Sequence, residues 1–248
     1  MPELLTLAGA IAVVMGANIG TTLTAWIMAL FGFSMDLSQL SWLIFACAIP
    51  FIFSGNSGRK SFGEFLFGFA FMFLGLITLR THATEMNLQD NPAVVNFFMG
   101  TGDWGFLSVL LYVLIGSLLT LCVQSSAAIM AITMILCSTG VLPIYQGIAL
   151  VMGENIGTTL TSNIAAMSAN PQARRAALAH LMFNLFGGIW VLILFKPFIR
   201  AVCGLWGIDP DAGHENMTQE EISDMNFKLT YVLATFHTAF NVINTLIL

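Results

Sequence analysis

The chain has 248 residues, of which 57% are hydrophobic and only 8% are charged. Ordinary soluble domains carry roughly 25% charged residues, so this composition excludes a surface that mainly faces water. The net charge is −5 and no basic stripe is present, which argues against a nucleic-acid partner. The four cysteines lack the spacing of a zinc site or a disulfide framework. The sequence therefore predicts a multi-pass protein of the plasma membrane, surrounded by the lipid bilayer.

Long apolar runs give the expected membrane helices. Five runs approach or reach the roughly 20 residues that a spanning helix needs: residues 40–53, 62–79, 104–123, 176–195 and 227–248. Basic residues favour the cytoplasmic side of membrane proteins. We therefore expect the ends that carry Arg59 with Lys60, and Arg174 with Arg175, to lie inside. The acidic segments 81–103 and 207–226 are expected to be outer loops. In the second of these, Thr218 and Glu221 have the spacing of a helix-opening capping box.

One polar sequence occurs twice within the apolar chain. Met-Gly-Ala-Asn-Ile-Gly-Thr-Thr-Leu-Thr at residues 15–24 returns 137 positions later, at residues 152–161, with Glu154 in place of Ala17 as the one difference. Such near-identity indicates an internal duplication. The basic residues predict that the segments following the two copies leave the membrane on opposite faces. We therefore expect an inverted repeat, the architecture of many secondary transporters.

The motif combines residues that weaken a helix with residues that bind ions. Glycine costs a helix roughly 1 kcal/mol, and hydroxyl and amide side chains compete for its backbone hydrogen bonds. We expect a broken helix that lines a cavity, with free N–H groups for an anion and oxygen atoms for Na⁺. Alternatively, Gly and Thr here merely permit close helix packing. The candidate binding residues are Asn18, Thr21, Thr22, Asn155, Thr158 and Thr159.

A second polar element precedes the second copy. Gln124, Ser125 and Ser126 stand in a row within an apolar stretch, followed by about 14 apolar residues, a Gly/Pro turn and a short apolar return. Both limbs look too short to span the bilayer. This pattern predicts a re-entrant hairpin.

Together these motifs resemble the sodium–phosphate cotransporter family, the type II group with its bacterial relatives. That family is marked by a Gln-Ser-Ser hairpin followed by Gly-x-Asn-Ile-Gly-Thr-Thr, repeated in inverted halves. The resemblance covers nearly the whole chain, including residues 62–75 and the His-x-x-Phe-Asn pattern of residues 180–184 and 237–241. It implies an all-α membrane protein: an inverted-repeat secondary transporter with a re-entrant hairpin and broken helices.

The resemblance also implies function and site. The expected activity is sodium-coupled transport of inorganic phosphate, with both bound near the bilayer midplane and no cofactor apart from sodium as co-substrate. Phosphate and sodium would be bound by the six motif residues together with Gln124, Ser125 and Ser126, the sodium ligands being Ser126, Thr158 and Thr159. The resulting division is residues 1–37 for the remainder of the first repeat, 38–103 for linking helices and outer loop, 104–200 for the second repeat, 201–226 for the acidic loop and 227–248 for the final helix.

The sequence departs from the family pattern at three places. The counterpart of Gln124 would precede Met1, so we expect either a truncated sequence or a half-site protein that pairs with another chain, such as a homo-oligomer. Ala127 stands where the family often has a third serine. Glu154 is ionisable at membrane depth and is a candidate for cation binding or proton coupling. Pairing with His180 or pointing into water is an equal alternative for Glu154.

The roles of the two histidines in the His-x-x-Phe-Asn pattern allow two interpretations. His180 and His237 each have an asparagine four residues later, on the same helix face; hydrogen bonding between helices is the favoured interpretation, with proton coupling as the alternative.

A passive ion or anion channel, or a transporter of another oxyanion, fits the same pattern. An intramembrane hydrolase with Ser125 or Ser126 as nucleophile and His180 as base lacks an orienting carboxylate, so we expect no enzyme.

Overall fold

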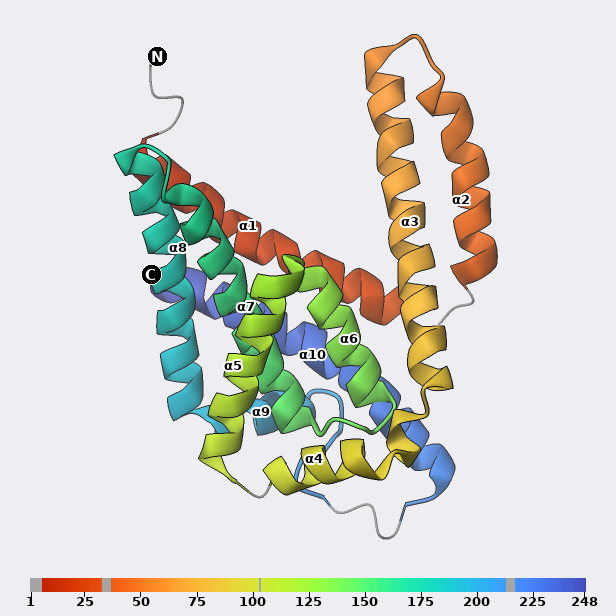
Figure 1. Ribbon diagram of the computed structural model, residues 1–248, viewed down its shortest axis with the longest axis vertical. Helices are drawn as coiled ribbons and strands as arrows, with labels where there is room; N and C mark the ends of the chain where they lie inside the picture. Colours follow the sequence, from red (N-terminus) through yellow and green to blue (C-terminus); the bar gives the residue numbers. More distant parts are fainter. Residues whose placement is uncertain (1–5, 33–36, 103, 213–216) are drawn as a thin grey trace. The chain divides into compact units, whose positions relative to one another are not determined.

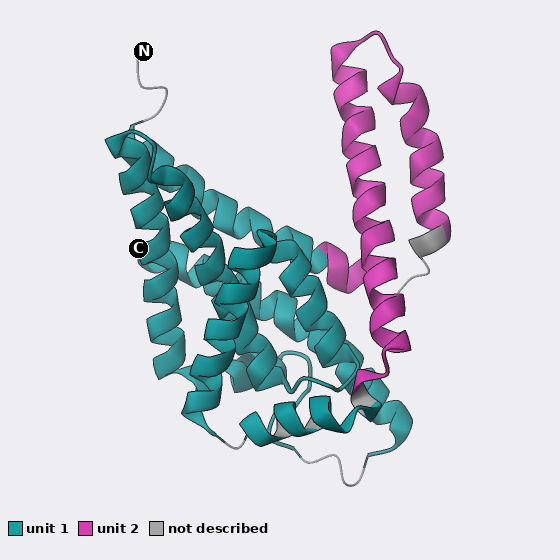
Figure 2. Ribbon diagram, viewed as in Figure 1, with its two compact units in different colours: residues 1–26, 89–248 teal, residues 27–88 magenta. Residues whose placement is uncertain are grey.

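A computed structural model describes residues 6–32, 37–102, 104–212 and 217–248 of the protein (Figure 1). These residues form helices and connecting turns, and no strand occurs among them. The all-α expectation is thus confirmed. Contacts divide the chain into two compact units, residues 27–88 and residues 1–26 with 89–248 (Figure 2).

The smaller unit is a helical hairpin. A π-helical turn, Met28–Gly32, precedes α2 (Leu37–Ile52) and α3 (Ser57–Glu85). The Asn56 side chain caps the first turn of α3 by accepting from two backbone N–H groups. Phe45 on α2 packs edge-on against Phe67 and Phe71 of α3, each with ring centroids 4.9 Å apart. The two helices are held together mainly by apolar side chains.

The larger unit contains α1 (Leu7–Ile27) up to Trp26 and the helices that follow the hairpin. These are α4 (Pro92–Gly102), α5 (Phe106–Val123), α6 (Ser126–Ser138), α7 (Ile144–Ala166), α8 (Pro171–Ile193), α9 (Phe195–Gly204) and α10 (Gln219–Ile247). Helix α7 has the longest buried stretch, since every residue from Gln146 to Glu154 is buried. It contacts α5, α6, α8 and α10, so the second motif copy lies in the core of this unit.

The helices agree only in part with the expected spans. Within the part of the chain that the structure describes, four are long and apolar enough to cross a membrane: Leu7–Gly32, Ser57–Glu85, Phe106–Val123 and Pro171–Ile193. Three of the five expected runs fall in these helices, whereas residues 40–53 lie in a shorter helix and 227–248 form the end of α10. The segment 81–103, expected to be an outer loop, is mostly helical, because α3 continues to Glu85 and α4 follows; its side of the membrane stays a prediction. The capping box of Thr218 and Glu221 is confirmed and opens α10.

The expectation of a break within the repeated motif is wrong for both copies. Helix α1 runs from Leu7 to Ile27 and α7 from Ile144 to Ala166 without interruption. Because α7 has 23 residues, it is about 35 Å long and is not the short limb that we expected. Helix α6 does match the expected short limb, since its 13 residues give a length of about 20 Å, which is less than the roughly 30 Å thickness of the hydrocarbon core.

The two motif helices run in opposite directions. Trp26, close to the end of α1, stacks at a tilt on Trp206, with ring centroids 6.3 Å apart. Tyr145, at the start of α7, donates a hydrogen bond to Asp211, five residues beyond Trp206. The end of α1 and the start of α7 therefore lie at the same end of the larger unit. The opposite end of α7 is marked by Asn163, which donates to the Ala177 carbonyl near the start of α8.

Candidate functional site

The break in this region occurs between α5 and α6, at the Gln-Ser-Ser sequence. Gln124 has φ 56° and ψ 27°, a left-handed conformation that is uncommon for a residue with a side chain. Its N–H still bonds to the Thr120 carbonyl at 2.8 Å, so it terminates α5 in the manner of a C-cap. Ser125 then caps α6, since its Oγ accepts from the Ala128 N–H at 3.3 Å. The chain thus reverses direction at these two residues.

The start of α6 leaves backbone donors without partners inside the helix. The first N–H groups of any α-helix have no intrahelical acceptor, and here the Ser125 side chain satisfies only that of Ala128. Those of Ser126 and Ala127 are the remaining donors of this turn. Together with the partial positive charge of the helix end, they form an arrangement suited to an anion.

Close helix packing explains the glycines of the second motif copy. Gly153 lies against the Val113 carbonyl and Gly157 against Ser117 and Thr120, all on α5. A Cβ added at Gly157 would lie 2.6 Å from the Ser117 carbonyl oxygen, so only glycine fits there. These glycines, four residues apart, let α5 and α7 approach closely, as the packing alternative predicted.

The equivalent glycines of the first copy have no such neighbour. An added Cβ at Gly16 or Gly20 would have no neighbouring heavy atom within 4 Å, and both residues are exposed. The sequences of the two copies are nearly identical here. Therefore the difference in packing comes from their surroundings, since α5 covers only the second copy.

The motif threonines make the same hydrogen bonds in both copies. Thr21 and Thr158 donate to the carbonyl four residues earlier, at 2.9 and 3.0 Å. Thr22 and Thr159 donate to the carbonyl three residues earlier, at 2.7 and 2.6 Å. We expected the threonine hydroxyls to compete for backbone hydrogen bonds and to break the helix. Instead, they bond to carbonyl groups of a helix that stays intact. Each oxygen keeps lone pairs that could still contact a cation.

The two motif asparagines form equivalent pairs with two histidines. Asn18 Oδ1 lies 2.9 Å from His180 Nε2 on α8, and Asn155 Oδ1 lies 3.1 Å from His237 Nε2 on α10. The interhelical interpretation of both histidines is thus confirmed. The sequence showed the motif and the His-x-x-x-Asn pattern separately, but it contained no signal for which histidine meets which asparagine.

Glu154 is the one motif residue that has no counterpart in the first copy. Its side chain is 1% exposed, and its Oε2 has no hydrogen-bond partner. The carboxyl is buried, and the His180 Nε2 bonds to Asn18 rather than to Glu154. A buried charge requires compensation, so cation binding or proton coupling by Glu154 stays a prediction.

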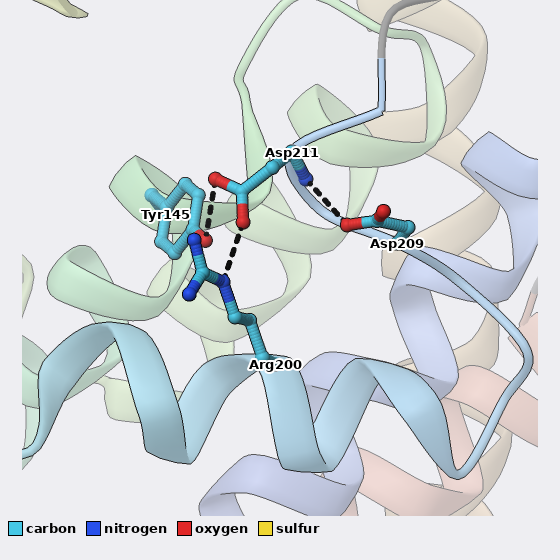
Figure 3. Close-up of polar contacts among 4 residues, drawn as sticks. All are labelled: Tyr145, Arg200, Asp209 and Asp211. Atoms are coloured by element: carbon cyan, nitrogen blue, oxygen red, sulfur yellow. Dashed lines mark hydrogen bonds and ion pairs between the residues drawn. The ribbon is translucent and has the colours of Figure 1, made fainter.

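A polar cluster that sequence reasoning missed fastens the acidic loop to the helices (Figure 3). Arg200 Nε on α9 and Tyr145 Oη on α7 bond to the two carboxylate oxygens of Asp211, at 2.6 and 3.0 Å. Asp209 Oδ1 accepts from the backbone N–H of Asp211 at 3.0 Å. The Arg200 hydrogen bond lowers the pKa of Asp211 below its usual value. The cluster fixes the loop next to the start of the motif helix.

The hydrolase alternative gains no support from this geometry. Ser125 Oγ serves as a helix cap, and the proposed base, His180, is bonded to Asn18. His180 also borders a cavity of about 540 Å³ between α1 and α8, which is lined almost wholly by apolar side chains such as Val14 and Phe186. No serine, threonine or cysteine lies among the residues that line this cavity.

Comparison with known proteins identifies relatives of the whole motif region. The Na⁺/Pi-cotransporter family profile matches residues 2–81 and 108–205, which is more than half of the chain. The chain is 32% identical over 206 residues to the putative inorganic phosphate export protein YjbB of Escherichia coli, covering 83% of this chain and 35% of that protein. It is 28% identical over 194 residues to the uncharacterized protein YqeW of Bacillus subtilis, covering 78% of this chain and 58% of that protein.

A mammalian relative matches a shorter part. The sodium-dependent phosphate transport protein 2C of Mus musculus is 37% identical over 102 residues, 39% of this chain and 16% of that protein. The chain thus spans about a third to three fifths of the length of the two bacterial relatives. No solved structure matches it.

Proposed function

Because the chain belongs to the Na⁺/Pi-cotransporter family, we propose that it takes part in sodium-coupled transport of inorganic phosphate across the plasma membrane. The family is one of transporters, which agrees with the expectation that the chain is not an enzyme. The observation that carries the proposal is the chain reversal at Gln124 and Ser125, which presents the start of α6 inside a membrane protein.

Phosphate is the ligand that best suits the start of α6. The N–H groups of Ser126 and Ala127 and the Gln124 side chain supply donors, and the helix dipole favours negative charge. In Figure 1, the junction of α5 and α6 is drawn well short of the end that α7 and α8 reach together. This placement, with the short α6, supports a re-entrant hairpin whose bend lies within the membrane.

Sodium would bind close to the same junction through oxygen ligands. Ser126, Thr158 and Thr159 provide hydroxyl oxygens, and hard cations prefer such ligands. Glu154 is buried on the same helix as the two threonines and is the candidate coupling group. The opposite directions of α1 and α7 support the inverted repeat, in which equivalent segments face the site from the two sides of the membrane.

The first motif copy is proposed to require a further helix. Gly16 and Gly20 lack the cover that α5 gives to Gly153 and Gly157, although the sequences match. In the working transporter, we expect the open face of α1 to pack against a helix that resembles α5, from another chain or from a longer form of this one. The proposed activity therefore concerns that assembly.

Uptake of labelled phosphate into proteoliposomes tests the proposal. We expect uptake when Na⁺ is higher outside and little uptake when K⁺ replaces it. The Ser126→Ala variant should be reduced, and the Ser57→Ala variant, at the exposed start of α3, should be unchanged. Uptake that ignores the sodium gradient would favour the channel alternative. Absence of phosphate uptake by an assembly that also supplies the additional helix would contradict the phosphate assignment.

A further inference from the structure

The two asparagine–histidine pairs have the same atomic arrangement although they involve different helices. In each, the asparagine is the fourth residue of the motif and the histidine opens a His-x-x-x-Asn pattern. In each, the contact joins the asparagine Oδ1 to the histidine Nε2. Two independent copies with one arrangement indicate that the geometry is part of the site rather than incidental packing.

The atoms in contact determine which group donates. A side-chain amide oxygen can only accept, so the histidine Nε2 must carry the hydrogen. The amide nitrogens, Asn18 Nδ2 and Asn155 Nδ2, are both buried and both lack a hydrogen-bond partner. Buried donors without partners are rare in folded proteins and call for an explanation. In each copy, then, the amide N–H₂ of the motif asparagine lacks a partner, and near the second copy Glu154 Oε2, His237 Nδ1 and Asn241 Oδ1 lack one as well.

Each histidine has an asparagine one turn later that bonds to its backbone carbonyl. Asn184 Nδ2 donates to the His180 carbonyl at 3.1 Å, and Asn241 Nδ2 donates to the His237 carbonyl at 2.9 Å. His237 is 1% exposed and packs in the core of the larger unit. A histidine whose Nε2 carries the hydrogen can orient the amide that it contacts, because rotation of that amide by 180° would bring two donors together.

We propose that His180 and His237 are positioning residues that hold Asn18 and Asn155 with the amide N–H₂ group free, so that each motif copy presents a hydrogen-bond donor to an oxyanion oxygen. This rests on the proposed function and deepens it, since it assigns the motif asparagines to phosphate. The histidine N–H engages the asparagine oxygen, so the inference assigns the amide nitrogen to the ligand.

Exchange of asparagine for aspartate distinguishes a phosphate contact of the amide nitrogen from a sodium contact of the amide oxygen. Asn155→Asp keeps an oxygen for His237 but replaces the free N–H₂ group with an oxygen, which repels an anion and suits a cation. Loss of a hydrogen bond to a charged ligand corresponds to a change of about tenfold or more in Kd. We expect the Kd for phosphate to rise by this factor, as measured by titration calorimetry in nanodiscs, while the half-saturating Na⁺ concentration stays unchanged. Asn18→Asp should behave alike, and Asn56→Asp, at an exposed helix cap, is the matched control.

A change in sodium affinity with unchanged phosphate affinity would overturn the proposal. The histidines provide a second test: His237→Leu, which lacks the donor, should weaken phosphate binding, whereas His237→Gln, whose amide can still donate, should restore it. Equal loss in the two variants at equal thermal stability would contradict a positioning role. The exposed His82→Gln variant is the control.

The histidine tautomer tests the inference without any ligand. Nitrogen-15 NMR of histidine-labelled protein in nanodiscs, assigned with the His180→Gln and His237→Gln variants, reports which ring nitrogen carries the hydrogen. We expect a hydrogen on Nε2 in both residues. A hydrogen on Nδ1 alone would overturn the inference, whatever the ligand. Failure of the assembly that supplies the additional helix to bind phosphate would instead contradict the proposed function, while the tautomer would still decide the amide orientation.

Discussion

The matched glycines of the two motif copies allow a sharp test of the helix packing. Gly157→Ala and Gly20→Ala introduce the same methyl group at equivalent positions of nearly identical sequences. At Gly157 the new Cβ would lie 2.6 Å from the Ser117 carbonyl oxygen and 2.7 Å from the Thr120 Cβ, whereas ordinary contact begins at 3.4 Å. At Gly20 no neighbouring heavy atom lies within 4 Å. Only the first substitution forces α5 and α7 apart.

The size of the expected effect on the melting temperature follows from the difference between the two variants. Alanine favours both helices over glycine by up to about 1 kcal/mol, and this term cancels in the comparison. Overpacking a tight contact costs about 1–3 kcal/mol. Because 1 kcal/mol shifts Tm by about 2–4 °C in a chain of this size, Gly157→Ala should melt several degrees below Gly20→Ala. Tryptophan fluorescence during heating in one detergent measures this difference. Equal melting temperatures would refute the packing derived for α5 and α7.

Three further predictions concern the site and the acidic loop. Ser125→Ala removes the cap of α6 and should cost about 0.5–2 kcal/mol of stability and weaken phosphate binding; calorimetry that shows unchanged binding would contradict the role of the α6 start. Glu154→Gln should reduce the dependence of phosphate uptake on Na⁺ or on pH, and unchanged cation dependence would remove Glu154 from coupling. The pKa of Asp211 is lowered in the folded protein, so its ion pair with Arg200 stabilises the loop above the ordinary aspartate pKa and is lost as the pH falls through the lowered value. Proteolysis of that loop should therefore accelerate on acidification, and Asp211→Asn should already be cleaved quickly at neutral pH.

Much of the fold was predictable because the bilayer imposes simple requirements on composition. Apolar runs located α3, α5 and α8, and the spacing of Thr218 and Glu221 located the start of α10. These signals are local, so a single sequence displays them. The basic residues also predicted opposite directions for the two motif copies, and the contacts of Trp26 and Tyr145 agree with that direction.

The behaviour of the motif itself was not predictable from local propensity. Gly153 and Gly157 weaken an isolated helix, yet α7 stays continuous because α5 packs closely on them. That stabilisation depends on a tertiary neighbour, which propensity does not include. The break occurs instead at Gln124, where a left-handed residue and a serine cap end one helix and start the next. The pairing of each asparagine with its histidine likewise depends on how the helices pack.

Sodium-dependent phosphate binding at the start of α6 is the most direct test of the central claim. Titration calorimetry with phosphate should show binding in Na⁺ that weakens when K⁺ replaces it, and about tenfold or greater loss in Gln124→Ala with its thermal stability preserved. The Gln39→Ala variant, at an exposed position of α2, should bind as the wild type does. Binding that is equal in K⁺, or that survives unchanged in Gln124→Ala, would contradict a sodium-coupled phosphate site at the junction of α5 and α6.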